Sequence, residues 1–236
     1  MEKEMRLDKY LADMGKGSRS QIKEAARKGR IQINGVITKK PDTKVNAKTD
    51  TIVFDGAVVS YVTMEYYMLN KPQGVVSATE DNKYQTVIDL IDGKNRKDLF
   101  PVGRLDIDTE GLLLITNDGP LAHRLLAPKK HVDKTYLVET REKVTEDMVL
   151  KLEQGVDIGE EKLTLPAKVE RKEDKKIELT ITEGKFHQVK RMLKAVDNEV
   201  VYLKRLSMGS LKLDGTLALG EYRSLTDDEI LELKKK

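Results

Sequence analysis

The chain has 236 residues, a formal net charge of +3 and no cysteine. That length suffices for one or two domains with a buried core, and the lack of cysteine excludes disulfides, a thiolate nucleophile and cysteine-ligated zinc. The first residues lack the apolar core of a signal peptide and no apolar run approaches bilayer-spanning length, so we expect a soluble, cytoplasmic protein with no membrane partner.

The positive charge is concentrated in the first 48 residues. They contain thirteen Lys and Arg against six Asp and Glu, a net of +7, which leaves −4 for the rest of a chain whose total is +3. A basic segment joined to a mildly acidic remainder favours two domains, the first of which binds a polyanion.

Two short helices and a hairpin are predicted within this basic segment. Residues 7–14 carry apolar side chains at the spacing of one helical face. Ser18 and Gln21 form a capping-box pattern that begins a second helix, and Gly29 ends it. The dipeptide at 34–35, Asn-Gly, lies between short apolar runs and predicts a tight β-hairpin.

A junction is expected after this module. We predict a module at residues 1–56, a linker at 57–64 and a larger domain at 65–236. Hydrophobic patterning in the larger domain predicts strands near 66–70, 112–116, 134–140 and 177–182, and helices near 145–154, 188–196 and 226–235. The predicted fold class is therefore α+β.

Residues 99–119 need a chemical explanation, because acidic side chains there precede the apolar run at 112–115. A carboxylate that enters a core is costly unless it is paired. In the simplest interpretation Asp106 or Asp108 caps a turn and Arg104 neutralises it. A calcium-binding loop that begins at Asp106 would place its twelfth position at Asn117 and the apolar residues 112–115 inside the loop, so this pattern does not fit. A haloacid-dehalogenase phosphotransferase would need a threonine two positions beyond the second aspartate, whereas Thr109 follows it directly.

Four segments, in order, resemble the motifs of the pseudouridine synthases. They are Asn-Lys-Pro-Gln-Gly at 70–74, Gly-Arg-Leu-Asp at 103–106 with its continuation to 119, Lys-Thr-Tyr at 134–136, and Glu-Gly-Lys-Phe-His-Gln-Val-Lys-Arg-Met at 183–192. The similarity is greatest to the RsuA branch, which acts on small-subunit ribosomal RNA. It implies a largely antiparallel central sheet with the catalytic cleft along it.

The resemblance implies roles for several of these residues. Asp106 matches the family's catalytic aspartate, which attacks C1′ of the ribose or removes the C2′ proton. Lys190 matches the basic residue that pairs with this aspartate. Arg104 is a second candidate for that pair, or it fills the gap left in the RNA by the flipped-out nucleotide, and the sequence leaves both roles open. Tyr136 matches the tyrosine that stacks against the uracil.

Further residues are candidates for binding the substrate. Arg191 and Lys71 join Arg104 in this group, although a structural role is the alternative for Lys71. The histidines at 123, 131 and 187 have no metal-ligand spacing and are interpreted as ordinary surface or core residues.

Residues 1–56 resemble the alpha-L RNA-binding module, which has the same helix, helix and hairpin. Its candidate RNA contacts are the basic residues Arg6, Lys9, Arg19, Lys23, Arg27 and Arg30. Few aromatic residues accompany them, so we expect binding to depend on phosphates and RNA shape, without base stacking.

The predicted function is isomerisation of uridine to pseudouridine in ribosomal RNA, and the resemblance favours 16S RNA as the substrate. That RNA is either free or part of an assembling small subunit. We expect the enzyme to be a monomer that needs no metal or other cofactor. One alternative is action on 23S RNA. Another is a non-catalytic RNA-binding protein of ribosome assembly. Asp106, Tyr136 and Lys190 argue against the latter, because a binder gains nothing from a desolvated carboxylate that faces a polyanion.

Overall fold

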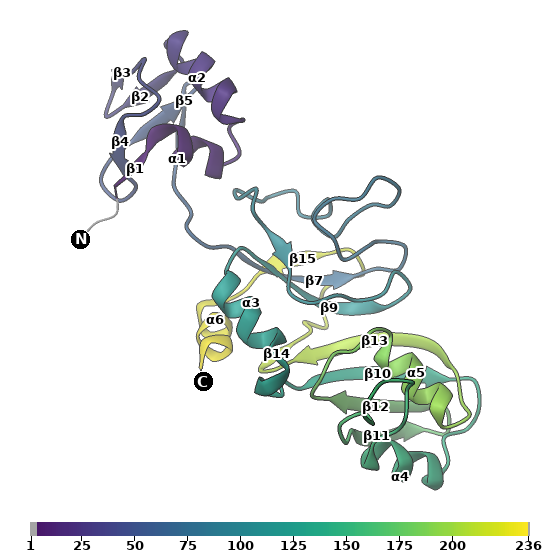
Figure 1. Cartoon of the computed structure of the whole chain (residues 1–236). Helices are drawn as coiled ribbons and strands as arrows, with labels where there is room; N and C mark the ends of the chain where they lie inside the picture. Colours follow the sequence, from purple (N-terminus) through teal and green to yellow (C-terminus); the bar gives the residue numbers. More distant parts are fainter. Residues whose placement is uncertain (1–3, 236) are drawn as a thin grey trace. The chain divides into compact units, whose positions relative to one another are not determined.

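The computed structural model describes residues 4–235, and this part of the chain divides into two compact units. Among the described residues, unit 1 comprises 4–65 and 93–99, and unit 2 comprises 66–92 and 100–235. Figure 1 labels most of their helices and strands. Each unit encloses a hydrophobic core of its own.

Unit 1 is a small α+β module. Its elements are β1 (Glu4–Arg6), α1 (Leu7–Asp13), α2 (Arg19–Arg27), β2 (Ile31–Ile33), β3 (Val36–Ile37), β4 (Lys44–Asn46), β5 (Ile52–Phe54) and β6 (Ala57–Val59). β1 pairs with β4, and a second antiparallel sheet has the order β3-β2-β5-β6. Both helices bury apolar faces against Ile31 and Ile52.

The local signals in unit 1 act as predicted. Ser18 Oγ accepts from the Gln21 amide at 3.3 Å, and Gln21 Oε1 accepts from the Ser18 amide at 2.7 Å, which completes the capping box. Asn34 and Gly35 both have positive φ, 51° and 81°, as a hairpin turn between right-twisted strands requires.

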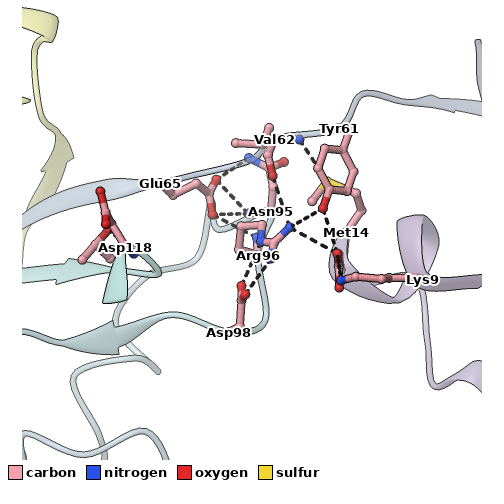
Figure 2. A network of polar contacts seen from close by, with 11 residues as sticks. Lys9, Met14, Tyr61, Val62, Glu65, Asn95, Arg96, Asp98 and Asp118 are labelled. Atoms are coloured by element: carbon pink, nitrogen blue, oxygen red, sulfur yellow. Dashed lines mark hydrogen bonds and ion pairs between the residues drawn. The ribbon is translucent and has the colours of Figure 1, made fainter. Parts of the chain in front are cut away.

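The boundary of unit 1 differs from the predicted linker at 57–64. Residues Ala57–Val59 form β6, and the distant segment Gly93–Leu99 also folds into this unit. Arg96 explains the second difference, because its buried guanidinium donates to Asp98 and to the Tyr61 hydroxyl and lies 3.6 Å from Asp13 (Figure 2). A buried cation is stable only where such acceptors surround it.

Unit 2 is built on a large, mostly antiparallel sheet. Its strands are β7 (Tyr66–Lys71), β8 (Phe100–Pro101), β9 (Glu110–Thr116), β10 (Lys134–Thr140), β11 (Lys168–Glu173), β12 (Lys176–Ile181), β13 (Val200–Met208), β14 (Leu211–Lys212) and β15 (Tyr222–Ser224). They follow the order β11-β12-β10-β13-β9-β7-β15, with β14 on β13 and β8 on β9. β13 and β9 run parallel where they meet, at Lys204–Glu110 and Arg205–Gly111.

Helices pack against this sheet. They are α3 (Gly119–Leu126), α4 (Glu146–Gln154), α5 (Gln188–Ala195) and α6 (Asp227–Lys234), with a 3-10 turn at Pro128–Lys130. α3 and α6 contribute Leu121, Leu125 and Leu233 to a core that includes Met68 and Leu114 of the central strands. Within residues 4–235, every helix is too short or too polar to cross a bilayer.

The α+β class is confirmed, and the predicted strands and helices of the larger domain occur within a few residues of their expected bounds. The central strand β13 was not predicted. Its sequence carries Lys204 and Arg205 in the middle of an apolar run, so its pattern does not identify it as a buried strand.

Candidate active site

Asp106 lies on the loop that joins β8 to β9. Gly103 at its start has a φ of 78°, and Gly111 at its end has a φ of 101°. A side chain at Gly111 would collide with the backbone of Arg205, so glycine permits the parallel approach of β9 to β13. The Asp106 carbonyl accepts from the Thr109 amide at 3.0 Å, which closes a turn and leaves the carboxylate 26% exposed.

Lys190, on α5, bridges Asp106 and Asp108. Its Nζ is 3.0 Å from Asp106 Oδ2 and donates to Asp108 Oδ1 at 2.6 Å. Partial burial lowers the pKa of Lys190, but the hydrogen bonds to both carboxylates outweigh it and the pKa lies above the ordinary value. The same hydrogen bond holds the pKa of Asp108 below its usual range. Of the cations considered for Asp106, Lys190 is the one in contact with it.

Arg104 is exposed, and its guanidinium makes no hydrogen bond or ion pair with any residue that the structure describes. It is therefore open to a ligand. Arg191 is not, since it donates to Glu160 Oε1 at 2.8 Å, to the Phe186 carbonyl at 3.0 Å and to the Ile158 carbonyl. Arg191 braces the loop that leads into α5.

Lys71 lies fully buried beneath the Asp106 loop. Its ammonium donates to the carbonyls of Pro72 at 3.0 Å, Asp106 at 3.1 Å and Thr109 at 2.9 Å. Burial lowers its pKa from 10.5 to about 8, against the nearby carboxylates of Asp108 and Asp106 that raise it. These contacts and the burial of Lys71 favour its structural role over the predicted contact with substrate.

His187 also lies at this site, which its interpretation as an ordinary histidine did not anticipate. It precedes α5 with a φ of 49°, a left-handed conformation that is unfavourable for a non-glycine residue. Its Nε2 is 3.5 Å from Asp106 Oδ1. Its spacing from Lys190, one turn along the helix, is the sequence signal that could have placed it here.

Sheet register connects Tyr136 to the same region. Tyr136 of β10 pairs with Arg205 of β13, Arg205 with Gly111 of β9, and Gly111 with Lys71 of β7. Residues far apart in sequence thus form one row across the sheet, which ends at the lysine that holds the Asp106 loop. The Tyr136 side chain is largely buried, with 8% exposed.

Arg205 was not recognised in the sequence. It is 2% exposed, its Nε donates to the Leu112 carbonyl at 2.8 Å, and one of its terminal nitrogens has no partner among residues 4–235. Asn70 Oδ1 and Thr109 Oγ1, at the adjoining ends of β7 and the Asp106 loop, are likewise buried without a partner in the described chain. Buried polar atoms without a partner are uncommon, and a catalytic role or a bound water is among their explanations.

The RNA-binding candidates of unit 1 divide into paired and unpaired groups. Arg6, Lys9 and Arg30 form ion pairs with Asp8, Asp13 and Asp55. Arg19, Lys23 and Arg27 are exposed, and none of them forms an ion pair in the part of the chain described. Because they are spaced by four residues on α2, they form one basic stripe.

The geometry of unit 2 presents a carboxylate that is partly open to solvent and fixed by a cation. Such a group can act as a nucleophile or a base. Among residues 4–235, no cluster of three or more His, Asp or Glu side chains is arranged to hold a metal ion.

Comparisons with known proteins agree with this geometry. Residues 65–195 match the family model described as RNA pseudouridylate synthase, and residues 5–52 match the S4 domain. An uncharacterized RNA pseudouridine synthase of Bacillus subtilis (strain 168), YtzG, is 52% identical over 96% of this chain and 97% of its own length. Ribosomal small subunit pseudouridine synthase A of Escherichia coli (strain K12) is 42% identical over 96% of this chain and 98% of its own length.

A solved structure shows the same fold. The crystal structure of a pseudouridylate synthase superposes with a TM-score of 0.69 at 41% sequence identity, and the match covers 97% of this chain and 99% of that one.

Proposed function

The chain belongs to the RNA pseudouridylate synthase family, and from this premise we propose that it isomerises a uridine of small-subunit ribosomal RNA, with Asp106 as the catalytic carboxylate. The contact of Lys190 with both Asp106 and Asp108 is the observation that carries the catalytic assignment. The small-subunit assignment rests on relatives that are named for that activity and match almost the full chain.

The reaction breaks the N1–C1′ bond, turns the uracil and joins C5 to C1′. Asp106 serves it in one of two ways. It attacks C1′ and is displaced when C5 bonds there, or it removes the C2′ proton and returns it after the uracil has turned. Both routes need the ionised carboxylate beside the sugar, and an adjacent cation favours that form. Lys190 supplies the cation. In the last step C5 loses its proton, and N1, which has left the sugar, carries a proton in the product.

The other residues support this chemistry in distinct ways. Lys71 positions the Asp106 loop through its carbonyls. Tyr136 stacks against the uracil, and Arg104, exposed and unpaired in the described chain, contacts the RNA around the extruded nucleotide. All of these residues belong to unit 2 of one chain, so we propose that a monomer carries out the reaction. We also propose that it acts in the cytoplasm, because relatives are named for pseudouridine synthesis in the ribosomal small subunit.

The S4 domain contributes affinity for RNA in this proposal. The stripe of Arg19, Lys23 and Arg27 along α2 carries positive charges that no described acidic side chain neutralises by an ion pair. Side chains of this kind bind phosphates and do not read bases. They add to binding without taking part in the isomerisation.

The test is Asp106→Asn, which keeps the size of the side chain and removes the nucleophile. Tritium release from 5-labelled uridine in small-subunit ribosomal RNA should fall on the order of 10⁴-fold, while RNA binding persists. Asp108→Asn is the matched control, because Asp108 also contacts Lys190 but is more exposed, and it should lose far less activity. An Asp106→Asn variant that keeps a tenth of the wild-type rate would contradict the assignment.

The substrate is tested separately. Pseudouridines are mapped in both ribosomal RNAs from cells with and without the gene. Loss of a pseudouridine from the large-subunit RNA alone would show that the substrate assignment is wrong and would leave the catalytic one intact.

A further inference from the structure

Phe186 and His187 form an aromatic pair beside the candidate catalytic carboxylate. Their rings are stacked, with centroids 3.7 Å apart and planes inclined by 20°. Phe186 is 70% exposed, the joint highest exposure among the large apolar side chains of the described chain. His187 covers one face of the phenyl ring, so the pair presents a flat apolar surface to solvent.

The exposure of Phe186 does not come from a loosely held loop. Gln188 accepts from the Lys185 amide at 2.9 Å and donates to Glu183 Oε1 at 2.7 Å. Glu183 also accepts from the Leu165 amide at 3.0 Å, and Arg191 holds the Phe186 carbonyl. The loop is therefore braced on both sides, and the left-handed backbone of His187 is maintained by these bonds.

The position of the pair suits a ligand of the active site. His187 Nε2 lies 3.5 Å from Asp106 Oδ1, and Lys190 follows on the same helix. A flat aromatic surface with a cation beside it is the surface that unpaired nucleic-acid bases and their phosphates bind. A single exposed phenylalanine is ordinary on a protein surface, but this one is stacked, braced and one side chain away from the carboxylate.

We propose that the Phe186–His187 pair is a stacking platform for a base of the substrate RNA that flanks the target uridine. The target uracil itself needs an enclosed pocket once it is flipped out, whereas a neighbouring base, left without its stacking partner, needs an open flat surface. Stacking there stabilises the distorted RNA and holds the target sugar at Asp106. The proposal rests on the proposed function, since it requires that the ligand of this site is RNA.

The experiment is a double-mutant cycle between protein and RNA. An RNA fragment that contains the mapped target uridine is prepared intact and with an abasic nucleotide at either flanking position. Pseudouridine formation by wild type, Phe186→Ala, Phe186→Leu and Phe186→Tyr is measured on each. Leu150→Ala, an exposed apolar position on α4, is the matched control. Binding of each RNA is measured in parallel with the Asp106→Asn form of every variant.

On intact RNA, Phe186→Ala and Phe186→Leu should lower kcat/KM on the order of 5- to 150-fold, the range expected for one base stacked on an aromatic ring. Phe186→Tyr should restore the rate, because it keeps the ring. With the abasic nucleotide at the stacked position, the loss caused by Phe186→Ala should disappear, since the interaction is already absent.

Equal losses on intact RNA and on both abasic RNAs would overturn the proposal and show that Phe186 only positions His187. Wild-type rates on Phe186→Ala would overturn it as well. If the wild-type chain forms no pseudouridine in any RNA, the proposed function fails, and the binding cycle in the Asp106→Asn background still decides whether a flanking base contacts Phe186.

Discussion

Substitution of Lys71 by methionine tests the architecture beneath the active site most directly. Methionine keeps the apolar volume and removes both the charge and the hydrogen-bond donors. Lys71 is fully buried, and its ammonium joins the carbonyls of Asp106 and Thr109 to that of Pro72. We expect stability and turnover to respond in different ways to this change.

The effect on stability follows from the lowered pKa of Lys71. A pKa of about 8 in place of 10.5 corresponds to about 3 kcal/mol against the charged form in the folded protein. Below pH 8 folded and unfolded chains both carry the proton, so the cost is present in full. Between pH 8 and 10.5 the unfolded chain binds more protons, so the free energy of unfolding rises with pH. Relative to Lys71→Met, wild type should therefore gain about 3 kcal/mol across this interval.

At neutral pH the variant should remain folded. Methionine removes a buried charge, and this offsets the loss of hydrogen bonds to the loop carbonyls. We expect the unfolding free energies of wild type and Lys71→Met to lie within about 2 kcal/mol of each other. Turnover should nevertheless fall about 100-fold, because the loop that carries Asp106 is no longer held and a displacement of about 1 Å is enough for such a loss.

The assays are urea unfolding from about pH 7 to about pH 10.5 and single-turnover pseudouridine formation at neutral pH. Lys234→Met is the matched control, because Lys234 lies outside the four motifs and its ammonium donates to the Tyr66 hydroxyl at 2.8 Å, at the other end of β7 from Lys71. Its turnover should change little. Undiminished turnover in Lys71→Met, or an equal loss in Lys234→Met, would refute the reasoning.

Other contacts lead to further predictions. Lys190→Met should reduce single-turnover rates at saturating RNA. Lys190→Arg should recover part of the loss because it keeps a cation beside Asp106. Equal rates in both variants would show that the charge is not needed. Substituting Arg19, Lys23 and Arg27 together by glutamine should lower the slope of log affinity against log salt by about two and leave saturated turnover unchanged, whereas an unchanged slope would exclude these residues as phosphate contacts. Arg96→Met should destabilise unit 1 by about 2 kcal/mol, because the Tyr61 hydroxyl and the Val62 carbonyl lose their buried donor while Asp13 keeps Lys9, and urea unfolding would measure it.

Arg96 also limits how the S4 domain can be studied. Deletion of residues 1–55 removes Asp13 and most of unit 1, so Gly93–Leu99 would lose the surface on which it folds. A slower truncated enzyme would then report damage to that segment as well as the absence of RNA contacts. Substitutions on the α2 stripe avoid this difficulty because those side chains are exposed.

The sequence by itself determined the features that depend on neighbours along the chain. The capping box at Ser18 and Gln21 and the turn at Asn34-Gly35 involve residues at most three positions apart in the sequence. The sequence pattern and the structure that it forms therefore span the same few residues. The motifs at 103–106 and 183–192 likewise predicted that Asp106 and Lys190 pair, and their side chains lie 3.0 Å apart.

Only the tertiary structure decided what each cation does. In the sequence Lys71, Lys190, Arg191 and Arg205 are alike as charged residues. In the structure Lys71 is buried under a loop and Lys190 pairs with Asp106. Arg191 braces a loop, and Arg205 lies in the sheet with a nitrogen unpaired in the described chain. Sheet register places Lys71 and Arg205, because it joins β7, β9 and β13 across long stretches of chain, and the packing of α5 places Lys190 and Arg191. Burial and pairing are properties of those long-range contacts, and no local pattern of residues encodes them.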